Sequence, residues 1–321
     1  MIRRTSFIFI VLFLLSVSIS FAEANTAKKQ AESLDAKGCA GEFFGVKVPM
    51  ENYYFVKSVI ALFGNKWGEQ PKTTQQLQNA IWDQLLLSFI AFSQNITVTQ
   101  EEFDAEISKS LAAENVKFDW KKDKQAYEKW VKNKTNEPTV LFENQIKHLI
   151  QLDKLRNYVM DNIKSEVEDK EAYQKFLNEH NSLSLELVEF SQLRDAEDFF
   201  KQASGRSSFW DKQKKRRPKD FKRPGFVSLE FLTDIWRIPS DALYKMMQRE
   251  PGEIYPPRPI YKGYGVFKIL EKKQADESQY KEAKDPYYEE VRRRKKYDGL
   301  NLWFKNLKEQ AKIKIYHKEG G

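Results

Sequence analysis

Histidine and cysteine, two residue types common in acid–base and nucleophilic catalysis, are few and widely separated in this chain. Its three histidines are His148, His180 and His317, and its one cysteine is Cys39. The sequence contains no Gly-Lys-Ser/Thr phosphate loop, no His-Glu-X-X-His motif and no cysteine pair for a metal. We therefore expect no cofactor and no metal site.

Two glycine-rich phrases in the last third of the chain are the most informative motif. Gly-Glu-Ile at 252–254 precedes a short proline-rich strand, and 263–271 then reads Gly-Tyr-X-X-X-Lys-X-Leu-Glu. These phrases resemble the closing strands of the parvulin (PpiC-like) family of peptidyl-prolyl isomerases. The resemblance implies an active-site histidine where Gly265 stands, and a second within 187–190, where the family has His-Ile-Leu. Both histidines are missing, so the resemblance implies the fold without the catalytic groups.

An apolar shelf that receives proline is the other part of the site that the parvulin resemblance implies. The candidate peptide-binding residues are Phe231, Trp236, Met246, Met247, Tyr264 and Phe267. These side chains could instead form the core of a small α/β domain. A groove that binds peptide without catalysis is the functional alternative.

Other segments resemble the SurA family of periplasmic chaperones. Thr99 and Glu102 form a capping box after a hydrophobic turn. The preceding segment, 81–90, is comparable to the family's Leu-Ile-X-X-X-Leu-Leu helix, and the apolar stripe over 142–163 is comparable to the helix that leads into its isomerase domain. The resemblance covers roughly residues 75–316, and the order of the motifs carries more weight than any one of them.

Hydrophobic periodicity predicts a mixed, α+β fold. Apolar residues recur at three- and four-residue steps over 53–63, 77–89, 142–163 and 287–312, which is the pattern of amphipathic helices. Alternation over 183–190 predicts a half-buried strand. We expect a helical N-terminal chaperone module, completed by a C-terminal helix, with an inserted small parvulin-like α/β domain. The Trp303, Phe304 and Leu307 side chains should pack on the helical module.

The predicted domain organisation has five parts. These are a signal peptide (1–22), a flexible lead (23–52), a helical chaperone module (53–170), a parvulin-like domain (171–275) and the C-terminal helix (276–321).

The N-terminus indicates export. Arg3 and Arg4 precede an apolar run from Phe7 to Ile19, and small-residue frames predict cleavage after Ala22 or Ala24. The run is shorter than the roughly 20 residues that span a bilayer, so we expect no stable membrane insertion after cleavage. An uncleaved anchor is the alternative. A periplasmic or otherwise exported protein does not meet nucleic acid, so the net charge of +8 favours acidic clients or a negatively charged membrane surface.

A dense basic run occupies 212–223, in the family's variable loop. In some parvulins this region supplies an anion site, and clustered cations would suit one. A solvated loop is the alternative.

Three hypotheses of function follow. The first is an envelope chaperone, with 23 Phe and 14 Tyr available for contact, that holds unfolded or extended clients, including outer-membrane proteins. The second is an active, divergent peptidyl-prolyl cis-trans isomerase, and the missing histidines rank it below the first. The third is a scaffold anchored in the membrane by its N-terminal run.

Overall fold

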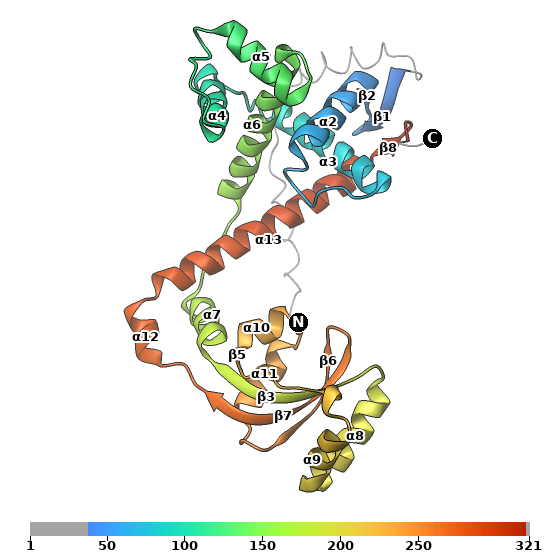
Figure 1. The fold of residues 1–321 in the computed structure, drawn as a ribbon, viewed down its shortest axis with the longest axis vertical. Helices are drawn as coiled ribbons and strands as arrows, with labels where there is room; N and C mark the ends of the chain where they lie inside the picture. Colours follow the sequence, from blue (N-terminus) through green and yellow to red (C-terminus); the bar gives the residue numbers. More distant parts are fainter. Residues whose placement is uncertain (1–37, 319–321) are drawn as a thin grey trace, which may run out of the picture. The chain divides into compact units, whose positions relative to one another are not determined.

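The computed structural model describes residues 38–318 and divides the chain into two compact units (Figure 1). The first unit runs to Ile163 and resumes at Tyr297, and the second is Lys164–Lys296. The predicted signal peptide, residues 1–22, lies outside the described residues. Between residues 38 and 318, no helix has both the length and the apolarity needed to cross a bilayer.

Helices predominate in the first unit. Its elements are β1 (Cys39–Phe43), β2 (Val46–Pro49), α2 (Met50–Phe63), α3 (Thr74–Ser93), α4 (Gln100–Ala113), α5 (Lys124–Thr135), α6 (Thr139–Asn162), the C-terminal part of α13 (Asp285–Ala311) and β8 (Lys314–Ile315). Two capping boxes begin its helices. Thr73 accepts a hydrogen bond from the Gln76 amide at the start of α3, and Thr99 does so from Glu102 at the start of α4, as the sequence predicts.

The second unit combines a sheet with short helices. Its elements are α7 (Asp169–His180), β3 (Ser182–Phe190), α8 (Leu193–Gly205), α9 (Ser207–Arg216), a 3₁₀ turn (Pro218–Asp220), β4 (Phe221–Lys222), β5 (Phe226–Ser228), α10 (Leu229–Asp234), α11 (Ser240–Met247), β6 (Ile254–Ile260), β7 (Gly263–Lys273), α12 (Glu277–Glu282) and the start of α13.

A β-hairpin opens the described chain, where the sequence predicts a flexible lead over 23–52. Strands β1 and β2 pair antiparallel around a two-residue loop, and β1 pairs on its other side with β8. The loop residues Phe44 and Gly45 have φ of 52° and 72°, the positive values that a type I′ turn requires. The flexible lead is therefore wrong for residues 39–52, because long-range pairing with β8 orders this segment. Cys39, expected in a linker, is buried in β1.

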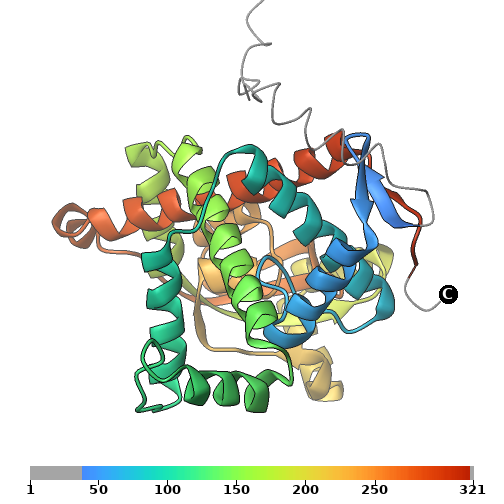
Figure 2. The same ribbon diagram turned by 90° about the horizontal axis from the view of Figure 1, so that it is seen from above.

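Two apolar clusters hold the first unit together. The larger joins the hairpin, α2, α3, the C-terminal half of α6 and α13, where Leu300, Leu307 and Ala311 are buried and Trp303 and Phe304 pack against them. The smaller joins α4, α5 and the N-terminal half of α6 around Phe103. Figure 2 shows α6 in green between α2 in blue and α4 in teal. Helix α6 therefore contributes to both clusters.

An antiparallel sheet is the centre of the second unit. Its strand order is β4-β3-β7-β6, and β5 also pairs with β3. Helices α10 and α11 cover one face and α8 and α9 the other (Figure 1). Strand β6 contains Pro256, Pro257 and Pro259 and lies at an edge, where a residue without an N–H is tolerated. The α+β fold class and the proline-rich strand are confirmed.

The observed unit boundaries differ from the predicted ones at 170 and 276. Phe176 of α7 packs on Tyr280 of α12 with ring centroids 5.4 Å apart, and Tyr287 of α13 packs on Phe176 at 5.4 Å. These aromatic contacts attach α7, α12 and the start of α13 to the second unit. The segment 212–216, expected in a loop, is also helical, because α9 is anchored by the buried Trp210.

Candidate functional site

The positions at which the parvulin resemblance implies histidines lie on adjacent strands. In the β3–β7 ladder, Leu187 is opposite Phe267 and Glu189 is opposite Gly265. A Cβ atom at Gly265 would lie 2.6 Å from Leu187 Cδ1 and 2.7 Å from Phe267 Cζ. Both side chains are buried in the core below α10 and α11. The volume that a side chain at position 265 would occupy is therefore filled by apolar groups.

Two ionisable residues stand directly opposite Gly265, Arg258 on β6 and Glu189 on β3. The Glu189 carboxylate pairs with the Lys222 ammonium at 2.6 Å, on the short strand β4. A carboxylate already paired with a cation is a poor substitute for the polar groups that surround a twisted peptide bond. Neither of the two positions therefore carries an imidazole, and the carboxylate opposite Gly265 is already held in an ion pair.

The six residues predicted to bind peptide do not share one surface. Met246 and Phe267 are fully buried and Met247 is 8% exposed, so these three support the sheet. Trp236 packs on the same core. Tyr264 packs on the opposite face, with the α8–α9 cluster. Phe231 is 42% exposed, and it is the most open member of the set.

A buried carboxylate fastens α9 to the other face of the sheet. Glu186 of β3 accepts a hydrogen bond from Trp210 Nε1 at 2.8 Å and is paired with Lys214. Burial by itself raises the pKa of the Glu186 carboxyl, but the hydrogen bonds from Lys214 and Trp210 outweigh it, so that this pKa lies below its usual range. The Glu186 carboxylate is thus bonded to both Trp210 and Lys214, and this cluster holds α9 on the sheet.

Three glutamates of the second unit gather around one lysine. Glu179, Glu230 and Glu290 bring carboxylate oxygens close together, as metal ligands do. Lys175 forms ion pairs with all three, at 2.8 Å to Glu179 and to Glu290. Burial by itself lowers the pKa of Lys175, but the hydrogen bonds to the three glutamates raise this pKa by more. The pKa therefore lies above its usual value, and the side chain stays a charged ammonium. The Lys175 ammonium already occupies the point where the three carboxylates converge, and we assign no metal to this cluster.

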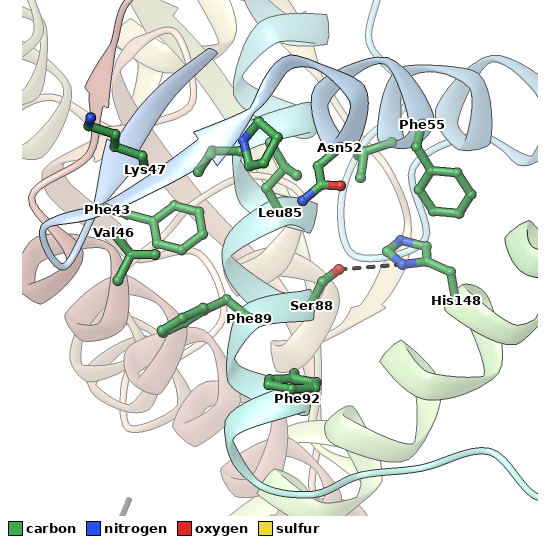
Figure 3. Close-up of a pocket in the computed structure, with 13 residues that line it drawn as sticks. Phe43, Val46, Lys47, Asn52, Phe55, Leu85, Ser88, Phe89, Phe92 and His148 are labelled. Carbon is green, nitrogen blue, oxygen red and sulfur yellow. Dashed lines mark hydrogen bonds between the residues drawn. The ribbon is translucent and has the colours of Figure 1, made fainter. Parts of the chain in front are cut away.

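An apolar pocket of about 400 Å³ lies in the first unit, between the hairpin, α2, α3 and α6 (Figure 3). Its lining residues are Phe43, Val46, Lys47, Val48, Pro49, Asn52, Phe55, Val56, Leu85, Ser88, Phe89, Phe92 and His148. Four of them are phenylalanines, which come from β1, α2 and α3. The pocket volume falls in the range of about 300–1,000 Å³ in which proteins hold small apolar groups.

Phenylalanines also form the rim of this pocket. Phe89 contacts Phe43 at a centroid distance of 5.2 Å and stacks on Phe44 at 5.9 Å. Phe92, one turn further along α3, is 63% exposed. Phe44 is 40% exposed although it stands at a left-handed turn position, where Asn would be favoured. A bulky residue with positive φ is a true outlier, and such outliers concentrate at functional sites.

One wall of the pocket is polar and uncharged. His148 of α6 is 8% exposed, and its Nδ1 lies 3.4 Å from the Ser88 hydroxyl (Figure 3). Its Nε2 lies 3.4 Å from Gln84 Oε1. Burial lowers the pKa of His148 to about 4, so the imidazole is neutral at ordinary pH. The pocket thus combines a large apolar area with a few neutral groups that can hydrogen-bond a polypeptide backbone.

Sequence reasoning did not identify this pocket, although it found part of one wall. The stripe on α3 that includes Leu85 and Phe89 was predicted as an amphipathic face. The signal that could have located the pocket is the Phe44-Gly45 pair, which places a phenylalanine where a turn residue belongs. His148 gave no such signal, because a histidine within an amphipathic stripe is usual in a core.

Comparisons with known proteins give similar structures but no sequence match. No family model matches the chain, and no curated protein matches it. One similar structure comes from Campylobacter jejuni and was described together with the SurA-like chaperones PEB4 and Cj1289. It is 15% identical to this chain, with a TM-score of 0.39, and the match covers 87% of this chain and 99% of that one. PrsA of Bacillus anthracis, a peptidylprolyl isomerase, is 15% identical at a TM-score of 0.42, covering 75% and 100%.

A third similar structure is PrsA of Bacillus subtilis, at 15% identity and a TM-score of 0.26, covering 89% of this chain and 97% of that one. SurA-like chaperones and peptidylprolyl isomerases are the same two kinds of protein that the sequence motifs resemble. At these identities and TM-scores the similarity carries no argument about activity. The function proposed below therefore rests on the residues of this chain.

Proposed function

We propose that the protein is an exported, periplasmic chaperone that holds unfolded or extended polypeptides, with the pocket of the first unit as its client site. In this proposal the second unit is a degenerate parvulin-like domain without isomerase activity. Unfolded outer-membrane proteins are the proposed clients, and the signal peptide is cleaved after Ala22 or Ala24.

The observation that carries the proposal is the exposed aromatic rim. The side chains of Phe44 and Phe92 are exposed beside an apolar pocket. Phe44 also has a positive φ, at a turn position where Asn or Gly is usually found. Aromatic side chains give a large contact area at low conformational cost, which suits binding of many different sequences. The neutral wall at Ser88 and His148 supports the proposal, because it adds hydrogen-bonding groups without selecting for charge.

An active isomerase is the second candidate, and the filled position at Gly265 counts against it. A histidine there would have to displace Leu187 or Phe267 from the core. Glu189, beside it, is already paired with Lys222. The first candidate therefore has the better support from the residues present.

Removing the rim tests the chaperone proposal. In the double variant Phe44→Asn and Phe92→Ser, the hairpin gains an Asn-Gly turn, so we expect it to remain folded. Loss of two exposed phenyl rings should raise the concentration that gives half-protection of an aggregating β-barrel protein by about tenfold. Light scattering after dilution of the client from urea measures this protection.

Tyr261→Ser is the matched control, because Tyr261 is an aromatic residue of the second unit that is 70% exposed. The control should protect the client as well as the unchanged chain does. Equal protection by the double variant, with an unchanged unfolding midpoint, would place the client site elsewhere.

A further inference from the structure

A basic surface covers the outer side of α9 and the segment after it. Between Arg206 and Arg223 the chain has nine basic and two acidic residues. Lys212, Lys215 and Arg216 are exposed and lie at positions i, i+3 and i+4, on one face of α9. Lys219 and Arg223 follow and are also exposed. We call these five residues the basic face.

The basic face contrasts with the cations around it, which have acidic partners. Lys214 is paired with Glu186, Lys222 with Glu189 at 2.6 Å, and Arg217 with Asp220 at 3.6 Å. Within residues 38–318, no ion pair involves a member of the basic face. Like charges so close together repel one another. The basic face therefore does not stabilise the fold, and it is available to an anionic partner.

An exposed phenylalanine follows the basic face in the chain, three residues after Arg223. Phe226 of β5 is 52% exposed and follows the turn at Gly225, whose φ is +81°. It is opposite Ser184 in the β3–β5 ladder, and Glu186 is two residues further along β3, so all three project from the same face of the sheet. Trp210 and Lys214 of α9 contact Glu186 on that face. Phe226 thus lies on the face of the sheet that α9 covers.

We propose that the basic face and Phe226 dock the second unit on an anionic lipid surface. Lysines are compact point charges on flexible stems, and they suit phosphodiester headgroups that have no fixed geometry. Each Lys or Arg near such a surface contributes to binding, and an exposed aromatic ring beside them can enter the interface. An acidic polypeptide would satisfy the cations equally well, but it gives no role to a bare phenyl ring among them.

Vesicle sedimentation tests the docking surface. The probes are vesicles of phosphatidylglycerol with phosphatidylcholine, and vesicles of phosphatidylcholine alone, with the chain from Asn25 onward, the form expected after export. The triple variant Lys212→Glu, Lys215→Glu and Lys219→Glu should bind the anionic vesicles roughly 100-fold more weakly. The control Lys72→Glu, Lys124→Glu and Lys129→Glu changes net charge equally at exposed sites of the first unit and should lose less than about threefold.

Two further measurements separate a lipid surface from other anions. Phe226→Ser should weaken vesicle binding about threefold, because a phenyl ring is then lost from the interface. Soluble polyglutamate should compete poorly with the vesicles. Tight binding of polyglutamate without vesicle binding would overturn the proposal, and so would equal losses in the triple variant and its control. The aggregation assay is independent, because the client site proposed above lies in the first unit.

Discussion

His148 is neutral because the first unit buries it, and that burial links folding to pH. Its ordinary pKa of 6.5 is lowered to about 4 in the folded protein. Between these two values the unfolded chain binds a proton that the folded chain does not. The folded state is therefore fully favoured above pH 6.5 and loses stability as the pH falls toward 4.

The size of this effect is on the order of 3 kcal/mol over the whole interval, from about 1.4 kcal/mol for each pKa unit. We expect the urea midpoint of the first unit to fall steadily from about pH 7 to about pH 4.5. His148→Gln, which keeps a polar group beside Ser88, should show a much shallower fall. A variant with the same pH dependence as the unchanged chain would show that other groups are responsible.

Individual residue roles were the hardest feature to predict from sequence. From the sequence, Met246, Met247 and Phe267 are candidates both for a peptide groove and for the core of a small α/β domain, and in the structure they are buried. An apolar side chain carries no mark of whether it faces a core or a ligand, since both environments favour it. Whether these side chains are buried or exposed depends on the helices α10 and α11, which cover that face of the sheet.

At the level of elements, the β3–β7 pair packs apolar side chains around the backbone of Gly265. Leu187, Phe267 and Ile260 surround the position of the Gly265 side chain. Any replacement there must displace buried atoms, which typically costs 1–3 kcal/mol. A histidine at position 265 would therefore need its neighbours to move as well.

This leads to a prediction about catalysis. The unchanged chain should isomerise a proline-containing peptide no faster than background, and Gly265→His should lower stability by about 1–3 kcal/mol without creating activity. A protease-coupled assay and a thermal unfolding curve measure the two outcomes. Robust turnover by the unchanged chain, lost in Phe231→Ala, would instead favour the isomerase.

Elements with local signals were predicted well, and elements that depend on distant partners were not. The Thr99–Glu102 capping box identified the start of α4, because cap and helix lie next to each other in sequence. The β1–β2 hairpin was missed, because its turn lacks Asn and β1 also pairs with Ile315. Helix α9 was missed because its many lysines suggested a solvated loop, while its anchor is Trp210 on Glu186.

At the level of the whole molecule, the first unit is discontinuous in sequence. The chain leaves it at Ile163 and returns at Tyr297. A Cβ atom at Gly299 would lie 2.7 Å from Ile163 Cγ2, so the two breaks are close together within this unit. A short flexible linker can therefore join them.

Deleting residues 164–296 and joining Ile163 to Tyr297 should leave client protection within about threefold of the full chain. The reason is that the pocket lies in the first unit, and so do the two apolar clusters that hold that unit together. The same light-scattering assay measures protection, and circular dichroism checks that the helices persist. Residues 164–296 alone are the complementary control. Full protection by that segment, with none by the deletion variant, would place the client site in the second unit.

The pairing of β1 with β8 also sets the order in which the chain can fold as it emerges during synthesis or export. Gly41 and Ile315 are partners, and the core around Trp82 includes Leu307 and Ala311. The second unit is one continuous segment of the sequence. All of its residues are therefore synthesised before the last helical turns and the last strand of the first unit. Closing so large a loop is slow, because its entropy is lost before the distant contacts form. Until the C-terminal segment is present, the part of this apolar cluster that Leu300, Leu307 and Ala311 cover stays exposed.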